Sequence, residues 1–266
     1  MSFHWWQIGW VVGILYLLLS GLIHWALWKG KRALPVSARS LTFALFVVHS
    51  ILLGALWLIK GLSPDSPEEL ALILSWLIVG VVLIQWMKQE LEAPSAFAMP
   101  IAGILIAFGA TGNDVSRLPP HLSRELLALH ITLLMAAYLL LMLAFSSAVA
   151  YLLTRAFLKR KRPLSLLQRL PPLEVTDQMT RRWVLFGLPF LIAGMLVGFL
   201  WAKAEGRSAW SDPKVSLSVL TLLLFLGYLH GRWVRRWEPT IAHIFIIVGC
   251  GALLITFLVA QHTLAL

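Results

Sequence analysis

Charged residues are scarce in this sequence. Only 13% of its 266 residues are charged and 59% are apolar, whereas an average soluble domain carries about 25% charged residues. A water-soluble protein of this size could not bury so much apolar surface, which excludes a soluble enzyme, a disordered chain and a secreted disulfide scaffold. The composition is typical of a polytopic α-helical membrane protein.

Cysteine and the common catalytic motifs are also missing. Cys250 is the single cysteine, so no internal disulfide and no multi-cysteine metal site can form. The sequence contains no phosphate-binding P-loop, no HExxH zinc motif and no GxSxG nucleophile motif. Almost every acidic residue falls in a predicted loop or at a helix end, unlike the intramembrane carboxylates of ion-coupled transporters. The polar ionisable groups that remain inside the predicted spans are histidines.

Eight apolar segments are long enough, or nearly long enough, to cross a bilayer core, which takes about 20 helical residues. They run near 5–28, 40–60, 69–87, 95–110, 126–154, 183–202, 215–231 and 240–262. The fourth is the weakest, because it is short and two prolines interrupt its start. The first is too long for a signal peptide and lacks a basic start, so we expect a retained helix. We therefore predict an all-α membrane protein with eight transmembrane helices, forming one integral membrane domain over 1–266.

The basic residues indicate the orientation of these helices. The formal net charge is +10, and membrane proteins collect Lys and Arg in cytoplasmic loops. One set of alternate loops holds 16 of the 22 basic residues: Lys29, Lys31, Arg32, Arg39, Lys88, Arg155, Lys159, Arg160, Lys161, Arg162, Arg169, Arg181, Arg182, Arg232, Arg235 and Arg236. We therefore predict that this set is cytoplasmic and that both termini lie on the outer, periplasmic side. Because loop topology explains the basic surplus, we expect no nucleic-acid partner.

Two of the eight histidines fall at similar depth near the predicted outer surface. His130 lies about one turn inside the outer end of the fifth segment, and His262 lies at the outer end of the eighth. Two neutral imidazoles that face each other there could provide both axial ligands of a haem iron. His4 and His121 are alternatives in the same region. A single membrane histidine more often forms a hydrogen bond between packed helices, and that interpretation stays open for each of them.

His49 differs from the other histidines because it falls near the middle of the second segment. An imidazole at that depth is costly without a partner, so we expect a polar partner, a water molecule or a ligand there. His24, His230 and His243 fall near the opposite surface, close to basic residues and water.

The 13 tryptophans mostly fall near helix ends, as in the aromatic belts of membrane proteins. Trp210 instead falls in a predicted outer loop, on the same side as the two outer histidines. An aromatic ring there could form an apolar platform for a flat porphyrin. Arg207 and Lys214 in the same loop could pair with its propionates.

Four stretches of the sequence resemble the cytochrome c assembly proteins, a family that includes the CcsA, CcmC and short HemX-like membrane proteins. They are Leu129-His130-Ile131, Trp210-Ser211-Asp212-Pro213-Lys214, Tyr228-Leu229-His230-Gly231-Arg232 and Gln261-His262, and they occur in the family's order. The resemblance spans roughly residues 40–266, and Phe46-Val47-Val48-His49 is similar to the second helix of the HemX-like branch. That short branch resembles this chain most closely, because only Trp210 remains of the family's tryptophan-rich loop.

The resemblance implies a multi-pass protein of the bacterial inner membrane that binds and delivers haem b in c-type cytochrome biogenesis. It assigns His130 and His262 as the axial ligands of the haem iron. The remaining assignments are Trp210 and Asp212, which shape the loop over the porphyrin, and His49 and His230, which are candidates for an internal haem site or relay.

The partners implied are haem, membrane lipids and possible recipients such as apocytochrome c, whose thiols covalent attachment requires, or other assembly proteins. We do not assign an independent catalytic activity. The alternative from the residues alone is a non-haem membrane module, either a small-molecule permease or a regulatory subunit of another membrane protein. In that interpretation the histidines only pack helices.

Overall fold

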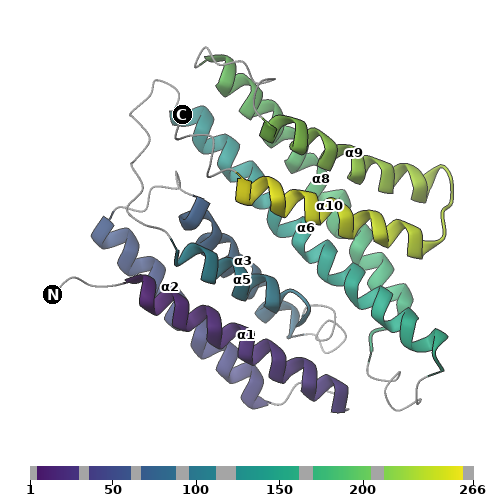
Figure 1. The fold of residues 1–266 in the computed structure, drawn as a ribbon, viewed down its shortest axis with the longest axis horizontal. Helices are drawn as coiled ribbons and strands as arrows, with labels where there is room; N and C mark the ends of the chain where they lie inside the picture. The colour runs from purple at the N-terminus through teal and green to yellow at the C-terminus, as the bar shows by residue number, and fades with distance from the viewer. Residues whose placement is uncertain are drawn as a thin grey trace. The chain divides into compact units, whose positions relative to one another are not determined.

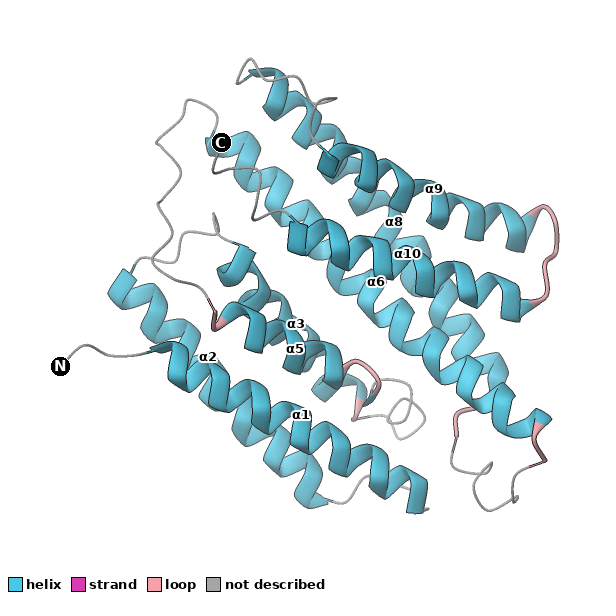
Figure 2. Ribbon diagram, viewed as in Figure 1, coloured by secondary structure: helices cyan, strands magenta, loops and turns pink. Residues whose placement is uncertain are grey.

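A computed structural model of the chain describes residues 5–29, 36–60, 67–87, 96–111, 124–161, 170–204 and 213–259. In these residues the chain forms eight helices and no strand (Figure 1; Figure 2). The helices are α1 (Trp5–Lys29), α2 (Val36–Lys60), α3 (Pro67–Gln85), α5 (Met99–Gly109), α6 (Arg124–Lys159), α8 (Leu173–Ala204), α9 (Pro213–Trp233) and α10 (Pro239–Val259). The prediction of an all-α membrane protein with eight helices is confirmed. The outer placement of both termini stays a prediction.

Seven of the eight described helices are long and apolar enough to cross a membrane. The shortest of these seven, α3, has 19 residues and is about 28 Å long, close to the thickness of a bilayer core. By contrast, α5 has 11 residues and is about 16 Å long. It corresponds to the fourth apolar segment, which the sequence marks as the weakest.

Helix boundaries differ from the predicted spans where a helix continues beyond its apolar part. The largest difference is at α8, which begins at Leu173, ten residues before the predicted span. Three helices, α3, α9 and α10, begin at a proline, which suits the first position because its missing N–H would have no helical partner there. Pro189 lies inside α8, as is tolerated in membrane helices.

The chain divides into two compact units. Unit 1 comprises Met1–Arg117 and Val149–Thr176, and unit 2 comprises Leu118–Ala148 and Asp177–Leu266. The prediction of one integral membrane domain over 1–266 stays a prediction.

In unit 1, α5 packs between α1 and α3 through small residues. Gly9 faces Ala110 and Gly13 faces Ala107, so α1 and α5 run in opposite directions. Gly109, at the end of α5, lies against Leu72 of α3. Small residues let membrane helices approach closely, since apolar burial alone does not hold helices together in lipid. The direction of α5 is the one expected of a fourth consecutive span.

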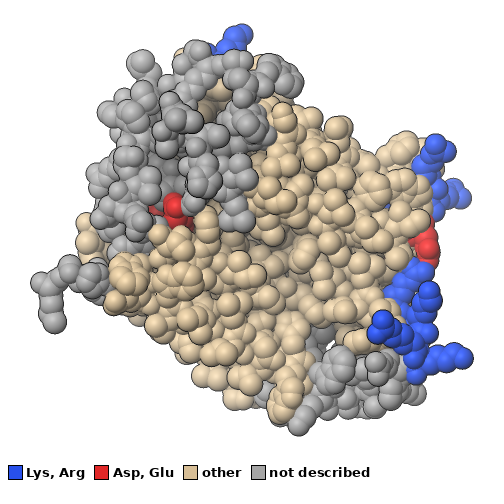
Figure 3. Space-filling model, in the orientation of Figure 1, with Lys and Arg blue, Asp and Glu red and all other residues tan. Residues whose placement is uncertain are grey.

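In unit 2, residues 124–148 of α6 pack antiparallel to α8, and α9 and α10 form an antiparallel hairpin (Figure 1). Figure 3 shows Lys and Arg at the edge where the α9–α10 turn lies, while mainly uncharged residues cover the helices. Large apolar side chains are exposed along α8 and α9, including Phe186 at 63% and Leu223 at 59%. Such an apolar surface suits contact with lipid.

Candidate functional site

His130 lies in the second turn of α6, where α8 fixes the orientation of its ring. The ring Nδ1 lies 2.7 Å from the carbonyl oxygen of Gly194. A carbonyl oxygen only accepts hydrogen bonds, so Nδ1 donates, and in the neutral ring Nε2 keeps its lone pair. Histidines that bind metal ions commonly hold their other ring nitrogen in this way.

The His130 ring packs against Gly198, one turn beyond Gly194. A methyl group on Gly198 would overlap the ring at Cε1 and Nδ1. Gly194 lies against Leu134, and Gly187 lies against the next turns of α6. These three glycines are seven and four residues apart, so they lie on one face of α8. They allow α6 and α8 to approach closely enough for the bond from His130 to a backbone carbonyl.

A cluster of charged side chains lies at the other end of α8. Arg232 Nη2 of α9 donates to Asp177 Oδ2 of α8 at 2.5 Å, and Arg181 Nη2 lies 3.4 Å from the same oxygen. His243 Nε2 of α10 lies 3.7 Å from Asp177 Oδ1. The side chain of Asp177 is 7% exposed, that of Arg232 13%, and that of His243 is fully buried. The cluster therefore joins three helices through largely buried charges.

The α9–α10 turn places Arg232 in this cluster. Gly231 has the ring of Trp237 packed directly against it, and the backbone N–H of Trp237 donates to the Gly231 carbonyl oxygen at 2.8 Å. Arg232 Nη1 in turn donates to the Trp237 carbonyl oxygen at 3.3 Å. Arg236 has a φ of 51°, in the left-handed region that reverses the chain within a short turn. The turn thus aligns the end of α9 with the start of α10.

His49 lies in α2 and is fully buried in unit 1. Neither ring nitrogen meets the geometry of a hydrogen bond within the described residues, but the backbone of Leu72 in α3 lies close enough to interact with the ring. The ring of Tyr16 from α1 lies beside it, with ring centroids 6.1 Å apart, and is also fully buried. The Tyr16 hydroxyl likewise has no partner in the described part of the chain. The expected requirement of His49 for a polar partner or ligand is therefore not met by these side chains.

Three of the six predicted site residues, His49, His130 and His230, lie in the described ranges. Trp210, Asp212 and His262 lie outside the described residues, as do the alternatives His4 and His121.

The structure separates His130 from His230 within unit 2. His230 is exposed in the last turn of α9, beside Arg232 and thus near the Asp177 end of α8. His130 instead packs near Gly194, 17 residues or about 26 Å farther along α8. These two histidines do not share one site. No group of three or more His, Cys, Asp or Glu that could hold a metal ion occurs in the described ranges.

Two features of unit 2 differ from the expectations from sequence. Asp177 falls in the predicted cytoplasmic loop but lies in the second turn of α8, buried and paired. His243 was expected near water but is fully buried, and its Nδ1 donates to the Pro239 carbonyl oxygen at 2.6 Å. The stretch Tyr228-Leu229-His230-Gly231-Arg232 carries the family resemblance, but nothing in the sequence indicates that Arg232 pairs with Asp177.

Known proteins resemble the chain over most of its length. The pattern of the Cytochrome C assembly protein family matches residues 88–264, which include His130 and the charged cluster. A cytochrome c biogenesis protein CcsA from Guillardia theta is 27% identical, covering 85% of this chain and 83% of the relative. A protein of the same name from Rippkaea orientalis is 26% identical, with coverages of 84% and 85%. No solved structure matches the chain.

Proposed function

Because this chain belongs to the cytochrome c assembly protein family, we propose that it acts in cytochrome c biogenesis as a membrane protein that binds and delivers haem. The haem is haem b, and the membrane is the inner membrane of a bacterium. The recipient is apocytochrome c or another assembly protein. The relatives' printed name and the match along most of both chains support this role.

The hydrogen bond from His130 to Gly194 carries the haem proposal. It directs the proton of the neutral ring to Nδ1 and leaves Nε2 with the lone pair that an iron ligand requires. The bond also holds the ring on the packed α6–α8 face, which lowers the entropy lost when a ligand binds. The residues present at His130 therefore fit an axial ligand of haem.

The remaining parts of the proposed outer site come from the family resemblance. His262 supplies the second imidazole, and Trp210 and Asp212 shape the loop over the porphyrin. His49 and His230 remain candidates for an internal haem site or relay. The His49 ring is fully buried, and no described side chain bonds to its nitrogens, which supports a ligand role.

Haem content and ligation test the proposal. We expect the full chain, purified in detergent from haem-replete cells, to show the spectrum of haem b with two histidine ligands. His130→Ala and His262→Ala should each lower haem retention, and added imidazole should partly restore it by replacing the lost ligand. His24→Ala is the matched control, because His24 Nδ1 also contacts a backbone carbonyl oxygen, that of Ser20, at 2.7 Å.

A substitution in α8 tests whether haem binding requires the position of the His130 ring, because it leaves the imidazole itself unchanged. Gly198→Ala should lower haem retention while His130 is still present, because the added methyl group overlaps the ring. Gly251→Ala is its control, since no atom lies within 4 Å of the added Cβ. A colourless wild-type protein that also fails to bind added haem would contradict the proposal and favour the non-haem membrane module. Unchanged haem in His130→Ala would remove His130 from the site.

A further inference from the structure

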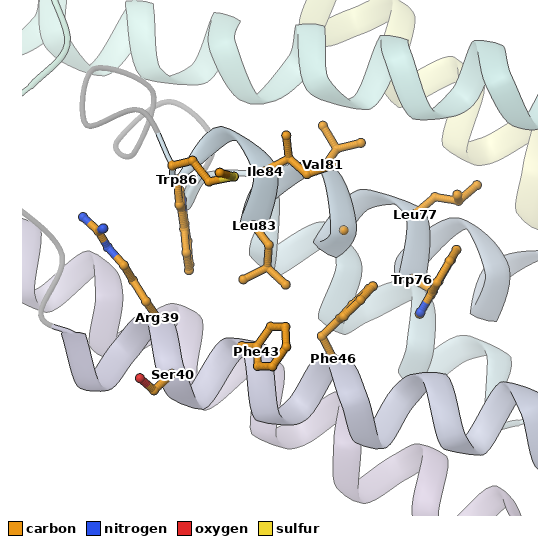
Figure 4. Close-up of a pocket in the computed structure, with 12 residues that line it drawn as sticks. Arg39, Ser40, Phe43, Phe46, Trp76, Leu77, Val81, Leu83, Ile84 and Trp86 are labelled. Atoms are coloured by element: carbon orange, nitrogen blue, oxygen red, sulfur yellow. The ribbon is translucent and has the colours of Figure 1, made fainter.

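A groove of about 810 Å³ lies between α2 and α3 in unit 1 (Figure 4). Its volume is within the range of about 300–1,000 Å³ typical of small-molecule sites. Arg39, Phe43 and Phe46 line it from α2, Trp76 and Gly80 line it from α3, and Trp86 lines it directly after α3. Arg39 faces Trp86 at one end, and Phe46 faces Trp76 at the other.

Aromatic rings form a fixed apolar wall along most of the groove. The rings of Phe46 and Trp76 stack, with centroids 5.4 Å apart and planes 15° apart. The Trp76 indole N–H donates to Ser50 Oγ at 2.8 Å, so its polar atom is already bonded within the protein. Phe43 is 60% exposed on a helix apolar enough to cross a membrane. This part of the groove therefore suits a flexible hydrocarbon chain from the surrounding lipid.

The opposite end of the groove is polar and cationic. Arg39 lies in the first turn of α2, and its guanidinium carries five N–H donors. Trp86 follows the last residue of α3; it is 2% exposed, and its indole N–H has no partner in the described part of the chain. In the sequence, Lys29, Lys31 and Arg32 precede α2 and Lys88 follows α3. The loop charges predict that this end lies at the cytoplasmic surface.

We propose that this groove binds an anionic phospholipid, with one acyl chain along Phe43, Phe46 and Trp76 and the phosphate at Arg39 and Trp86. Basic pockets between membrane helices at the cytoplasmic surface bind acidic head groups. A phosphate bound by the Arg39 guanidinium would lie at the end of the groove that Trp86 also lines.

The lining favours a lipid over an iron porphyrin. Among the described lining residues there is no histidine, cysteine or tyrosine, and the one side chain there that can ligate iron, Met87, is 83% exposed. The lipid site is therefore separate from the proposed haem ligands, and neither proposal depends on the other.

Lipid retention by the delipidated full chain tests the proposal. We would titrate dioleoylphosphatidylglycerol and dioleoylphosphatidylcholine into the detergent-purified protein and count bound lipids by native mass spectrometry. The acidic lipid should bind about fivefold more tightly, since one basic group near the surface contributes on the order of that factor. Arg39→Gln should abolish the preference, whereas Arg160→Gln, which removes an exposed arginine of the same unit, should preserve it.

A second variant tests the apolar part of the groove. Gly80 lines it, and an added Cβ would make ordinary contacts with Phe46 at 3.5 Å. Gly80→Leu should therefore fill the groove and lower retention of both lipids. Gly54→Leu is the matched control, because no atom lies within 4 Å of a Cβ added at Gly54.

Several outcomes would overturn the proposal. One is equal binding of the two lipids by the wild type. Another is unchanged acidic-lipid binding in both Arg39→Gln and Gly80→Leu. The third is complete displacement of the bound acidic lipid by inorganic phosphate. Loss of haem without loss of lipid in Gly80→Leu would assign the groove to haem instead. If Gly80→Leu does not elute as a folded protein, Arg39→Gln decides alone. Haem content should otherwise match the wild type in all four variants, which separates this test from that of the proposed function.

Discussion

Removing the Asp177 carboxylate should be among the most destabilising single changes in unit 2. Its partner Arg232 is only 13% exposed, and breaking a buried ion pair by removing one partner costs about 3–5 kcal/mol because a buried charge remains. We therefore expect Asp177→Ala to lower the free energy of unfolding by about 3 kcal/mol. Arg181 is 41% exposed and 3.4 Å away, so its pair with Asp177 should contribute less than about 1 kcal/mol.

Double-mutant cycles separate the two arginines. The free energy of unfolding would be measured in mixed micelles by titration with a denaturing detergent, followed by tryptophan fluorescence. We expect a coupling energy of about 2 kcal/mol between Asp177→Ala and Arg232→Gln, and less than about 0.5 kcal/mol between Asp177→Ala and Arg181→Gln. Arg182→Gln is the control, because Arg182 is the exposed neighbour of Arg181 on the same helix.

Equal coupling energies for Arg181 and Arg232 would refute this reasoning, because burial would then not determine the strength of the pair. So would an Asp177→Ala protein as stable as the wild type. Either result would mean that the buried cluster does not join α8 to α9 as the distances indicate.

Two further predictions concern His49 and the membrane topology. In haem-free protein, His49→Leu should raise the free energy of unfolding by about 1 kcal/mol, because the ring is fully buried and neither nitrogen reaches hydrogen-bond geometry within the described ranges, although the Leu72 backbone lies beside it; a decrease in the same detergent titration would contradict this. Reporter fusions at Ser165 should report the cytoplasm and fusions after Leu266 the periplasm, whereas the same side for both would mean that the helix count in the second half is wrong by an odd number.

The helices could be predicted from sequence because lipid imposes a simple rule. Every backbone polar group in hydrocarbon must bond within its own segment, so apolar length alone locates each span. That rule says nothing about helix outside the hydrocarbon. The first turns of α8, from Leu173 to Thr180, contain three charged or amide side chains, so the apolar run begins ten residues after the helix does.

The charged cluster could not be predicted, because its members are far apart in sequence. Asp177 precedes Arg232 by 55 residues, and no sequence feature near either residue indicates that the two form an ion pair. The spacing of Gly187, Gly194 and Gly198 on one face of α8 was a readable signal for close helix packing. The glycine spacing does not show, however, that His130 faces these glycines. That follows from the packing of α6 on α8.

The predicted depth of a histidine in the membrane indicates its role less well than its hydrogen bonds do. His24, His130 and His243 each contact a backbone carbonyl oxygen through Nδ1, but only the bond of His130 joins residues 64 positions apart on different helices. From sequence alone, helix packing and iron ligation are alternative roles for a membrane histidine. At His130 they are compatible, because the same bond that packs α6 on α8 fixes the proton on Nδ1 and leaves Nε2 able to bind iron. At His49 the backbone of Leu72 lies beside the ring, but no contact within the described ranges reaches the hydrogen-bond geometry that holds His130.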